Sequence, residues 1–141
     1  VTDLLLLFEQ GECAESEPCR EWLEEIIGDP KAERERLVAL TPANHVRDVE
    51  DPLLVAYGTR DSRVHPDHSH RLILMLETLE KPYEIFEIVG AGHSLDSRES
   101  IAYLRTLRRF LTQHLLPGSP FRPDPILEHG PAWIVPIRLT N

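Results

Sequence analysis

The fold is decided by residues 51–61, DPLLVAYGTRD. Five apolar residues, 53–57, follow one another between Pro52 and Gly58, and this run is short for a helix. A continuous apolar run of this length is typical of a strand that is covered on both faces, as in a parallel sheet. We therefore expect a buried strand at 53–57 within an α/β fold.

A helix and a second strand follow this run. Pro66 can begin the helix, which Lys81 and Pro82 end. Its apolar residues at helical spacing are Leu72, Ile73, Leu76 and Leu79. Residues 83–89, YEIFEIV, alternate well enough to form the next strand. Because the two strands begin about 30 residues apart, the order predicts a βαβ unit with neighbouring parallel strands.

Further helices flank this unit. Ser16 and Gly28 mark the start and the end of one helix, and a shorter helix is expected over residues 31–39. Residues 96–99, DSRE, have the pattern of a capping box for the last helix. The apolar face of that helix is expected to comprise Ile101, Leu104, Leu107, Leu111 and Leu115. We expect residues 1–116 to form the α/β part and residues 117–141, with six prolines, to form a proline-rich tail.

Charge and composition limit the classes of partner that this chain is expected to bind. The formal net charge of −9 opposes binding to nucleic acid and to anionic membrane surfaces. The longest apolar run, Leu4 to Phe8, is far below the roughly 20 residues that cross a bilayer. The two cysteines, Cys13 and Cys19, are interpreted as reduced structural thiols, with a local disulfide as the alternative. A cytoplasmic location is the default expectation.

An aspartate and a histidine follow the two expected strands at equal distances. Asp61 lies four residues after Tyr57, and His93 lies four residues after Val89. Because the carboxyl ends of parallel strands meet at one edge of a sheet, the two side chains are expected to lie close together. A carboxylate bonded to histidine Nδ1 fixes the tautomer and orientation of the imidazole, as in a hydrolytic triad. No metal or organic cofactor is implied.

Simpler interpretations remain open for these residues. Asp61 could be a turn residue, and His93 could merely bond a loop. The pattern Gly92-His93-Ser94-Leu95-Asp96 approaches a nucleophile elbow, with Asp96 where glycine is required. If Ser94 were the nucleophile, its base would have to be His114 or His129.

Other polar and aromatic residues are given structural interpretations. The histidines His65, His68 and His70 are expected on the solvated surface rather than in a zinc site. The arginines Arg105, Arg108 and Arg109 are expected on the solvated face of the last helix. Trp22 is expected in the core or as a lid over a substrate groove.

Three segments together resemble a known family. Residues 52–64, PLLVAYGTRDSRV, resemble the segment of prolyl-oligopeptidase-like serine hydrolases in which a buried strand leads to the triad aspartate. Residues 90–93, GAGH, are similar to their glycine-flanked catalytic histidine, and residues 40–46, LTPANHV, resemble the turn that precedes the acid-bearing strand. The resemblance covers about residues 20–115 and rests on order and spacing together.

The resemblance implies the C-terminal part of an α/β-hydrolase, with Asp61 as the acid and His93 as the base. It places the nucleophilic serine on a G-x-S-x-G elbow upstream of both, and no such elbow occurs in this sequence. The implied substrate is a peptide or an ester, with peptides slightly favoured. The chain alone is expected to be inactive, and to pair with the remaining N-terminal part of the hydrolase or with a second copy through a strand edge. The alternative is a non-catalytic α/β domain.

Overall fold

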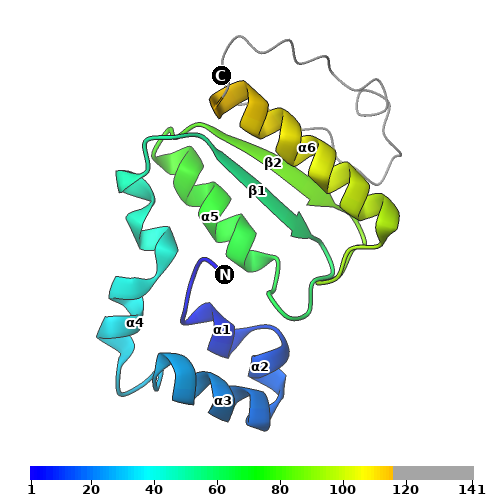
Figure 1. The fold of residues 1–141 in the computed structure, drawn as a ribbon. Helices are drawn as coiled ribbons and strands as arrows, with labels where there is room; N and C mark the ends of the chain where they lie inside the picture. The colour runs from blue at the N-terminus through cyan, green and yellow to red at the C-terminus, as the bar shows by residue number, and fades with distance from the viewer. Residues whose placement is uncertain (116–141) are drawn as a thin grey trace.

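Two parallel strands lie between two helices in the computed structural model, which describes residues 1–115 (Figure 1). Strand β1 (Leu53–Gly58) pairs with β2 (Tyr83–Ile88), with Leu53 opposite Tyr83 and Gly58 opposite Ile88. Helix α5 (Asp67–Thr78) connects the strands and covers one face of the sheet, and α6 (Ser97–Leu115) covers the other. The predicted βαβ unit is confirmed.

The alternation of the strands divides the core between these two helices. The α5 face buries Val55, Leu76 and Tyr83, which pack together. The α6 face buries Phe86, Ile88 and Ala102. Because successive side chains point to opposite faces, a strand with a helix over each face is apolar at nearly every position, as residues 53–57 are, although Ala56 on the α6 face is exposed.

The N-terminal residues form short helices with a small core of their own. These are α1 (Leu6–Glu9), α2 (Glu12–Glu15), α3 (Glu17–Ile27), α4 (Arg34–Leu40) and the 3-10 helix η1 (Pro42–Asp48). Phe8, Leu23 and Leu37 are buried together between α1, α3 and α4. Helix α3 matches its prediction, and α4 begins three residues later than predicted. Helices α1 and α2 were not predicted, because four residues are too few to show a helical period.

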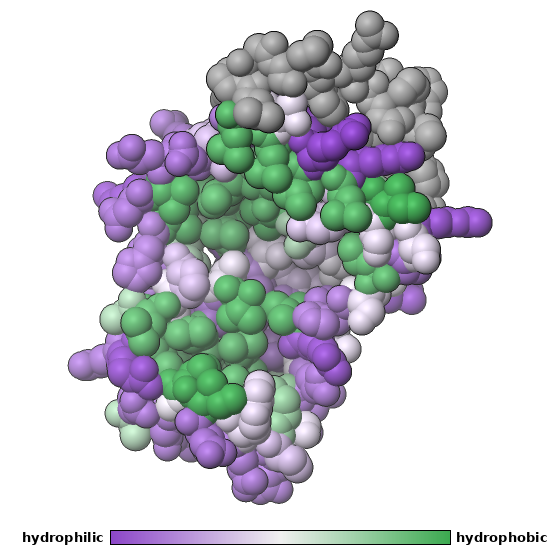
Figure 2. Space-filling view, in the orientation of Figure 1, coloured by the Kyte–Doolittle hydropathy of each residue, from purple (hydrophilic) through white to green (hydrophobic). Residues whose placement is uncertain are grey.

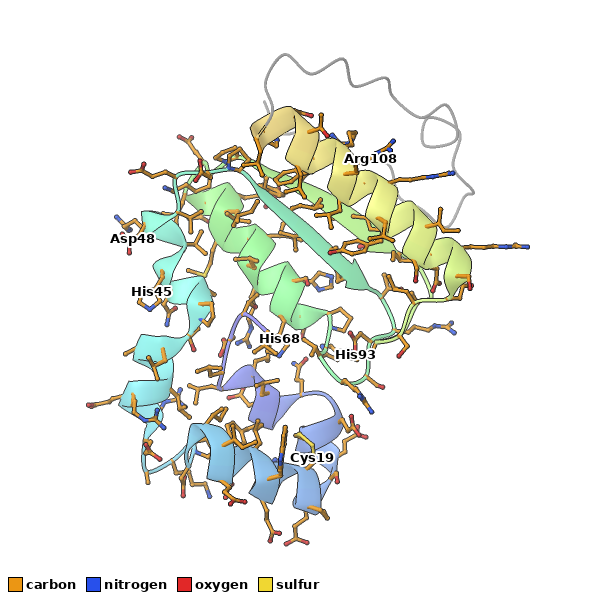
Figure 3. The ribbon with its side chains drawn as sticks, viewed as in Figure 1. Cys19, His45, Asp48, His68, His93 and Arg108 are labelled. Atoms are coloured by element: carbon orange, nitrogen blue, oxygen red, sulfur yellow. A yellow bond between two sulfur atoms is a disulfide. The ribbon has the colours of Figure 1, made fainter. Side chains whose placement is uncertain are left out.

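The expectation of reduced cysteines is wrong. Cys13 in α2 and Cys19 in α3 form a disulfide with their Cα atoms 4.8 Å apart (Figure 3). The extended backbone at Ser16 turns the chain between the two helices, which brings side chains six positions apart together. The disulfide removes one support for a cytoplasmic location, since disulfides are rare in reducing compartments.

Helix α6 begins as predicted but presents a different face to the sheet. Asp96 Oδ1 accepts hydrogen bonds from the backbone N–H groups of Arg98 and Glu99, and Glu99 Oε2 accepts one from the Asp96 N–H, which is a reciprocal capping box. The buried residues are Ala102, Thr106 and Phe110. The predicted apolar face is wrong: four of its residues are between 41% and 69% exposed, namely Ile101, Leu104, Leu111 and Leu115.

A buried ion pair explains the rotation of α6. Arg109 was expected on the solvated face, but its guanidinium binds the carboxylate of Glu84, which is buried on β2. A buried carboxylate requires a cation, so the helix turns Arg109 inward. The apolar residues on the opposite side then lie on the surface, where Figure 2 shows hydrophobic side chains along α6 and beside β1.

None of the helices within residues 1–115 is both long enough and apolar enough to cross a membrane.

Candidate active site

The loops that follow β1 and β2 leave the same edge of the sheet and are bonded to each other. We call residues 59–66 the acid loop and residues 89–96 the histidine loop. The backbone N–H of Arg60 donates to the carbonyl of Ala91 at 2.9 Å, and the N–H of Gly90 donates to Thr59 Oγ1 at 2.8 Å. A Cβ atom on Gly58 would lie 2.5 Å from the Ala91 carbonyl oxygen, so the close approach of the loops requires glycine there.

The two loops bring Asp61 and His93 into contact. His93 Nδ1 lies 2.9 Å from Asp61 Oδ2 and 3.2 Å from Asp61 Oδ1. The Asp61 side chain is 15% exposed and that of His93 is 45% exposed, so the imidazole remains accessible on one side. Figure 3 shows His93 in the loop beyond the carboxyl end of the sheet. With Nδ1 held by a carboxylate, Nε2 is the nitrogen that can exchange a proton with a nucleophile.

Backbone donors hold the Asp61 carboxylate in this position. Asp61 Oδ1 accepts hydrogen bonds from the N–H groups of Arg63 at 2.9 Å and Val64 at 3.0 Å. Partial burial alone would raise the pKa of Asp61. The hydrogen bonds from Val64, His93 and Arg63 outweigh it, so the pKa of this carboxyl is below its ordinary value. Asp61 is therefore an anion at neutral pH and can stabilise a protonated His93.

A hollow of about 210 Å³ lies beside His93. Its walls include Ala56 and Gly58 from β1, Leu95 from the histidine loop, and Tyr103 from α6. Ala56 is exposed although it lies within a strand, because it lines this open hollow. The hollow therefore gives access to the imidazole from the sheet side.

The alternative nucleophile Ser94 does not meet its candidate base. Ser94 is exposed in the histidine loop, at the carboxyl end of β2. His114 Nε2 lies 3.8 Å from Glu84 Oε1, near the opposite end of the same strand. His129 lies outside the described residues. The structure therefore places Asp61, and not His114, beside the Gly92-His93-Ser94 segment.

The three histidines His65, His68 and His70 were all expected on the solvated surface, but this expectation is wrong for His68. His68 is 1% exposed, and its Nδ1 accepts long hydrogen bonds of 3.4 Å from the N–H groups of Thr2 and Asp3. His68 lies in the first turn of α5, on the side that packs against the N-terminal residues, and this packing buries it. His65 and His70 flank Asp67 on the partly exposed side. Within residues 1–115, no three His, Cys, Asp or Glu side chains are grouped as a metal site would require.

The positions of Trp22 and Thr59 also differ from what the sequence indicated. Trp22 was expected in the core or as a lid, but it is 57% exposed on α3 because Leu23 is the residue that faces the core there. Thr59 was missed as a residue that joins the two loops. Its hydrogen-bond partner is 31 residues away in the sequence, so no local pattern could have indicated the contact.

Comparison with known proteins identifies the family. The model of the prolyl oligopeptidase family matches residues 4–117. The uncharacterized peptidase YtmA of Bacillus subtilis is 28% identical over 112 residues, which are 79% of this chain and 42% of that protein. The uncharacterized peptidase YuxL of the same organism is 28% identical over 85 residues, 57% of this chain and 13% of that protein. The chain thus spans less than half the length of these relatives.

Solved structures show the same fold. A puromycin-hydrolyzing peptidase of Mycobacterium tuberculosis superposes with a TM-score of 0.69 at 25% identity, over 82% of this chain and 17% of that chain. An acylaminoacyl peptidase of Pyrococcus horikoshii gives a TM-score of 0.72 at 20% identity, over 88% of this chain and 20% of that chain. The predicted fold class, a C-terminal α/β portion of an α/β-hydrolase, is confirmed. The chain belongs to the prolyl oligopeptidase family.

Proposed function

We propose that this chain supplies the acid and the base of a serine hydrolase, with Asp61 as the acid and His93 as the base. One observation carries the proposal: His93 Nδ1 lies 2.9 Å from a carboxylate that is itself fixed by two backbone N–H groups, at the carboxyl edge of a parallel sheet. Membership of a peptidase family supports it. The family order places the nucleophilic serine upstream of the residues in this chain.

In the proposed mechanism, the upstream serine oxygen attacks the substrate carbonyl carbon. His93 Nε2 accepts the proton that leaves the serine, while Asp61 stabilises the imidazolium through Nδ1. The protonated His93 then gives this proton to the leaving group as the carbonyl–leaving group bond breaks. Water repeats the sequence on the acyl-enzyme, with His93 again as base, and releases the acid product and the free serine.

A peptide or amide bond is the preferred substrate in this proposal, with an ester as the second choice. The matched relatives are described as peptidases, and two of the solved neighbours are described as acting on puromycin or on acylaminoacyl substrates. The hollow beside His93 shows access to the imidazole and does not by itself select a substrate.

The proposed partner of this chain is the remaining N-terminal part of the hydrolase, or a second copy, bound through the edge of β1. Within residues 1–115, β1 has a partner strand on one side only. Apolar residues on α6 are exposed along the same side of the molecule, as Figure 2 shows. Alone, the chain is expected to be inactive, since removal of a triad nucleophile costs orders of magnitude in rate.

The test is labelling by a fluorophosphonate probe, which reacts only with an activated serine. We expect the polypeptide that contains this chain and its upstream serine to be labelled. Asp61→Asn should slow labelling on the order of 10⁴-fold because the wrong tautomer of the imidazole is held, and His93→Ala should abolish it. His45→Ala is the matched control, because this exposed histidine bonds the Ala39 carbonyl in a different part of the fold.

Unchanged labelling in both triad variants would refute the assignment of Asp61 and His93. No labelling of the unaltered polypeptide would favour the second candidate, a non-catalytic α/β domain that retains the loop geometry.

A further inference from the structure

The turn between α1 and α2 lies directly against the acid loop. Gly11 has φ 87° and ψ −167°, a backbone conformation that is essentially limited to glycine. A Cβ atom at this position would lie 2.8 Å from the carbonyl oxygen of Arg63 and 3.2 Å from that of Ser62. Both of these atoms belong to the backbone, so neither can move away without moving the loop.

The residues on either side of Gly11 extend this contact. Glu12 Oε2 lies 3.1 Å from Arg63 Nε, and the Gln10 side chain lies close enough to the Asp67 carboxylate, at the start of α5, to lower its pKa. Three consecutive residues of the turn therefore contact the acid loop and the helix that follows it. The ion pair is exposed and contributes little by itself. The close packing at Gly11 is the contact that fixes the distance between the turn and the acid loop.

The same peptide segment holds the catalytic carboxylate on its other side. The Arg63 N–H donates to Asp61 Oδ1, while the Arg63 carbonyl faces Gly11. The acid loop thus lies between the turn and His93. A displacement of the Arg63 carbonyl by a few tenths of an ångström would move the donors that orient Asp61.

The turn is itself fixed to the N-terminal helices. The disulfide between Cys13 and Cys19 joins α2 to α3, and Arg20 Nη2 donates to the Phe8 carbonyl at 2.9 Å. Phe8 is buried in the small N-terminal core. The turn therefore lies on a cross-linked and packed support.

We infer that Gly11 is a positioning residue for the Asp61–His93 pair, and that the Cys13–Cys19 disulfide keeps its turn against the acid loop. The inference rests on the proposed function for its kinetic consequence, and it names residues outside the triad that set the geometry of the triad.

The test compares Gly11→Ala with Gly28→Ala in the polypeptide that includes the upstream serine. Gly28 has φ 111° and ψ 164°, so alanine meets similar backbone strain there, but the atoms nearest to its Cβ would belong to the flexible side chains of Glu33 and Arg36 and not to the backbone. Gly11→Ala should lower kcat for an ester substrate by 10-fold to 100-fold with KM within twofold, because small misplacements of catalytic groups have effects of about this size. Gly28→Ala should leave both constants within twofold.

A spectroscopic readout separates this inference from the proposed function. In both glycine variants and in the unaltered protein, the hydrogen-bonded Nδ1 proton of His93 is followed by proton NMR. It should be absent or shifted in Gly11→Ala and retained in Gly28→Ala, whether or not the protein hydrolyses the substrate. An unaltered protein with the Nδ1 signal but without His93-dependent turnover would count against the proposed function alone.

A double variant, Cys13→Ser with Cys19→Ser, provides a second test that does not depend on the folding of Gly11→Ala. It should lose threefold or more in kcat, and dithiothreitol should lower the unaltered enzyme to the same level without affecting the double variant. Three results would overturn the inference: equal kcat losses in the two glycine variants, a loss confined to KM, or an unchanged His93 signal and kcat in both Gly11→Ala and the cysteine double variant.

Discussion

Thr59 joins the acid loop to the histidine loop through one side-chain hydrogen bond, in which its Oγ1 accepts the Gly90 N–H. Thr59→Val keeps the shape of the side chain and removes the acceptor. We expect it to lower the free energy of unfolding by about 1 kcal/mol, because the Gly90 N–H loses its protein partner. Urea unfolding measures the change, and Thr59→Ser, which keeps the oxygen, should be close to the unaltered protein. Equal stability of the valine and serine variants would contradict a role for the bond.

His68 gives the protein a pH-dependent stability. Burial lowers the pKa of His68 from 6.5 to about 4. Between these values the unfolded chain binds a proton that the folded chain does not, so stability falls as the pH drops from about 6.5 towards 4. The loss is at most roughly 3 kcal/mol for a shift of this size.

Urea unfolding at pH 7.5 and pH 4.5 tests this dependence on His68. The unaltered protein should lose more stability between the two pH values than His68→Gln, whose side chain does not titrate. Both proteins contain the same carboxylates, so the difference between them isolates the histidine. The same loss in both proteins would show that His68 is not responsible.

The ion pair between Arg109 and Glu84 fixes the rotation of α6 on the sheet. Arg109→Met leaves the buried carboxylate without its cation. We expect this change to lower the free energy of unfolding by roughly 3 to 5 kcal/mol. Thermal unfolding measures it, and the matched control is Arg108→Met, one position away on the same helix but exposed, which should change stability by less than about 0.5 kcal/mol.

A double variant identifies the cause of that loss. Glu84→Leu combined with Arg109→Met removes both charges and should recover much of the stability. If the double variant were as unstable as Arg109→Met alone, packing rather than the unpaired charge would be responsible.

Some helices and strands of this chain were predictable from local sequence patterns, and others were not. Both strands, α3, α5 and the start of α6 followed from local patterns: an apolar run, an alternating run, a helical period and a capping box. The inward face of α6 did not follow from a local pattern. The helix has more apolar residues at helical spacing than it buries, and the residues that pack against the sheet are Ala102, Thr106 and Phe110. The deciding contact is with Glu84, 25 residues earlier, and a helical period carries no information about such a partner.

The site was predictable only where its residues follow strand ends. Asp61 and His93 were predicted to lie together because the carboxyl ends of parallel strands share an edge. In the structure, His93 Nδ1 lies 2.9 Å from Asp61 Oδ2. Their catalytic role stays a prediction. The contacts of Thr59 and Gly11 with distant backbone, and the disulfide between short helices, depend on turns whose geometry the sequence does not reveal.

At the scale of the whole molecule, the edge of β1 that has no partner strand within residues 1–115 predicts association. The N–H groups of Leu53 and Thr59 donate to the backbone carbonyls of Pro82 and Ile88 on the β2 side. In a parallel ladder the intervening N–H groups, including that of Ala56, then point to the other edge. We expect the chain to self-associate in a concentration-dependent way, which sedimentation velocity measures.

A proline at this edge should suppress association without disrupting the sheet. Ala56→Pro removes an N–H that β2 does not use, so the chain should sediment as a monomer and keep its circular dichroism. Val55→Pro is the matched control, because it removes an N–H directed towards β2 and should unfold the sheet. Association of Ala56→Pro equal to that of the unaltered chain would place the contact elsewhere, for example on the exposed residues of α6.

The bonds between the acid loop and the histidine loop lie entirely within this segment, from Arg60 N–H to the Ala91 carbonyl and from Gly90 N–H to Thr59 Oγ1. The two residues that we propose as the acid and the base, Asp61 and His93, therefore form one preassembled unit. A hydrolase of this family divided ahead of such a unit would make a split enzyme. Its turnover would rise with the product of the two fragment concentrations, and fusing the fragments to two other proteins would make the pair a reporter of their proximity.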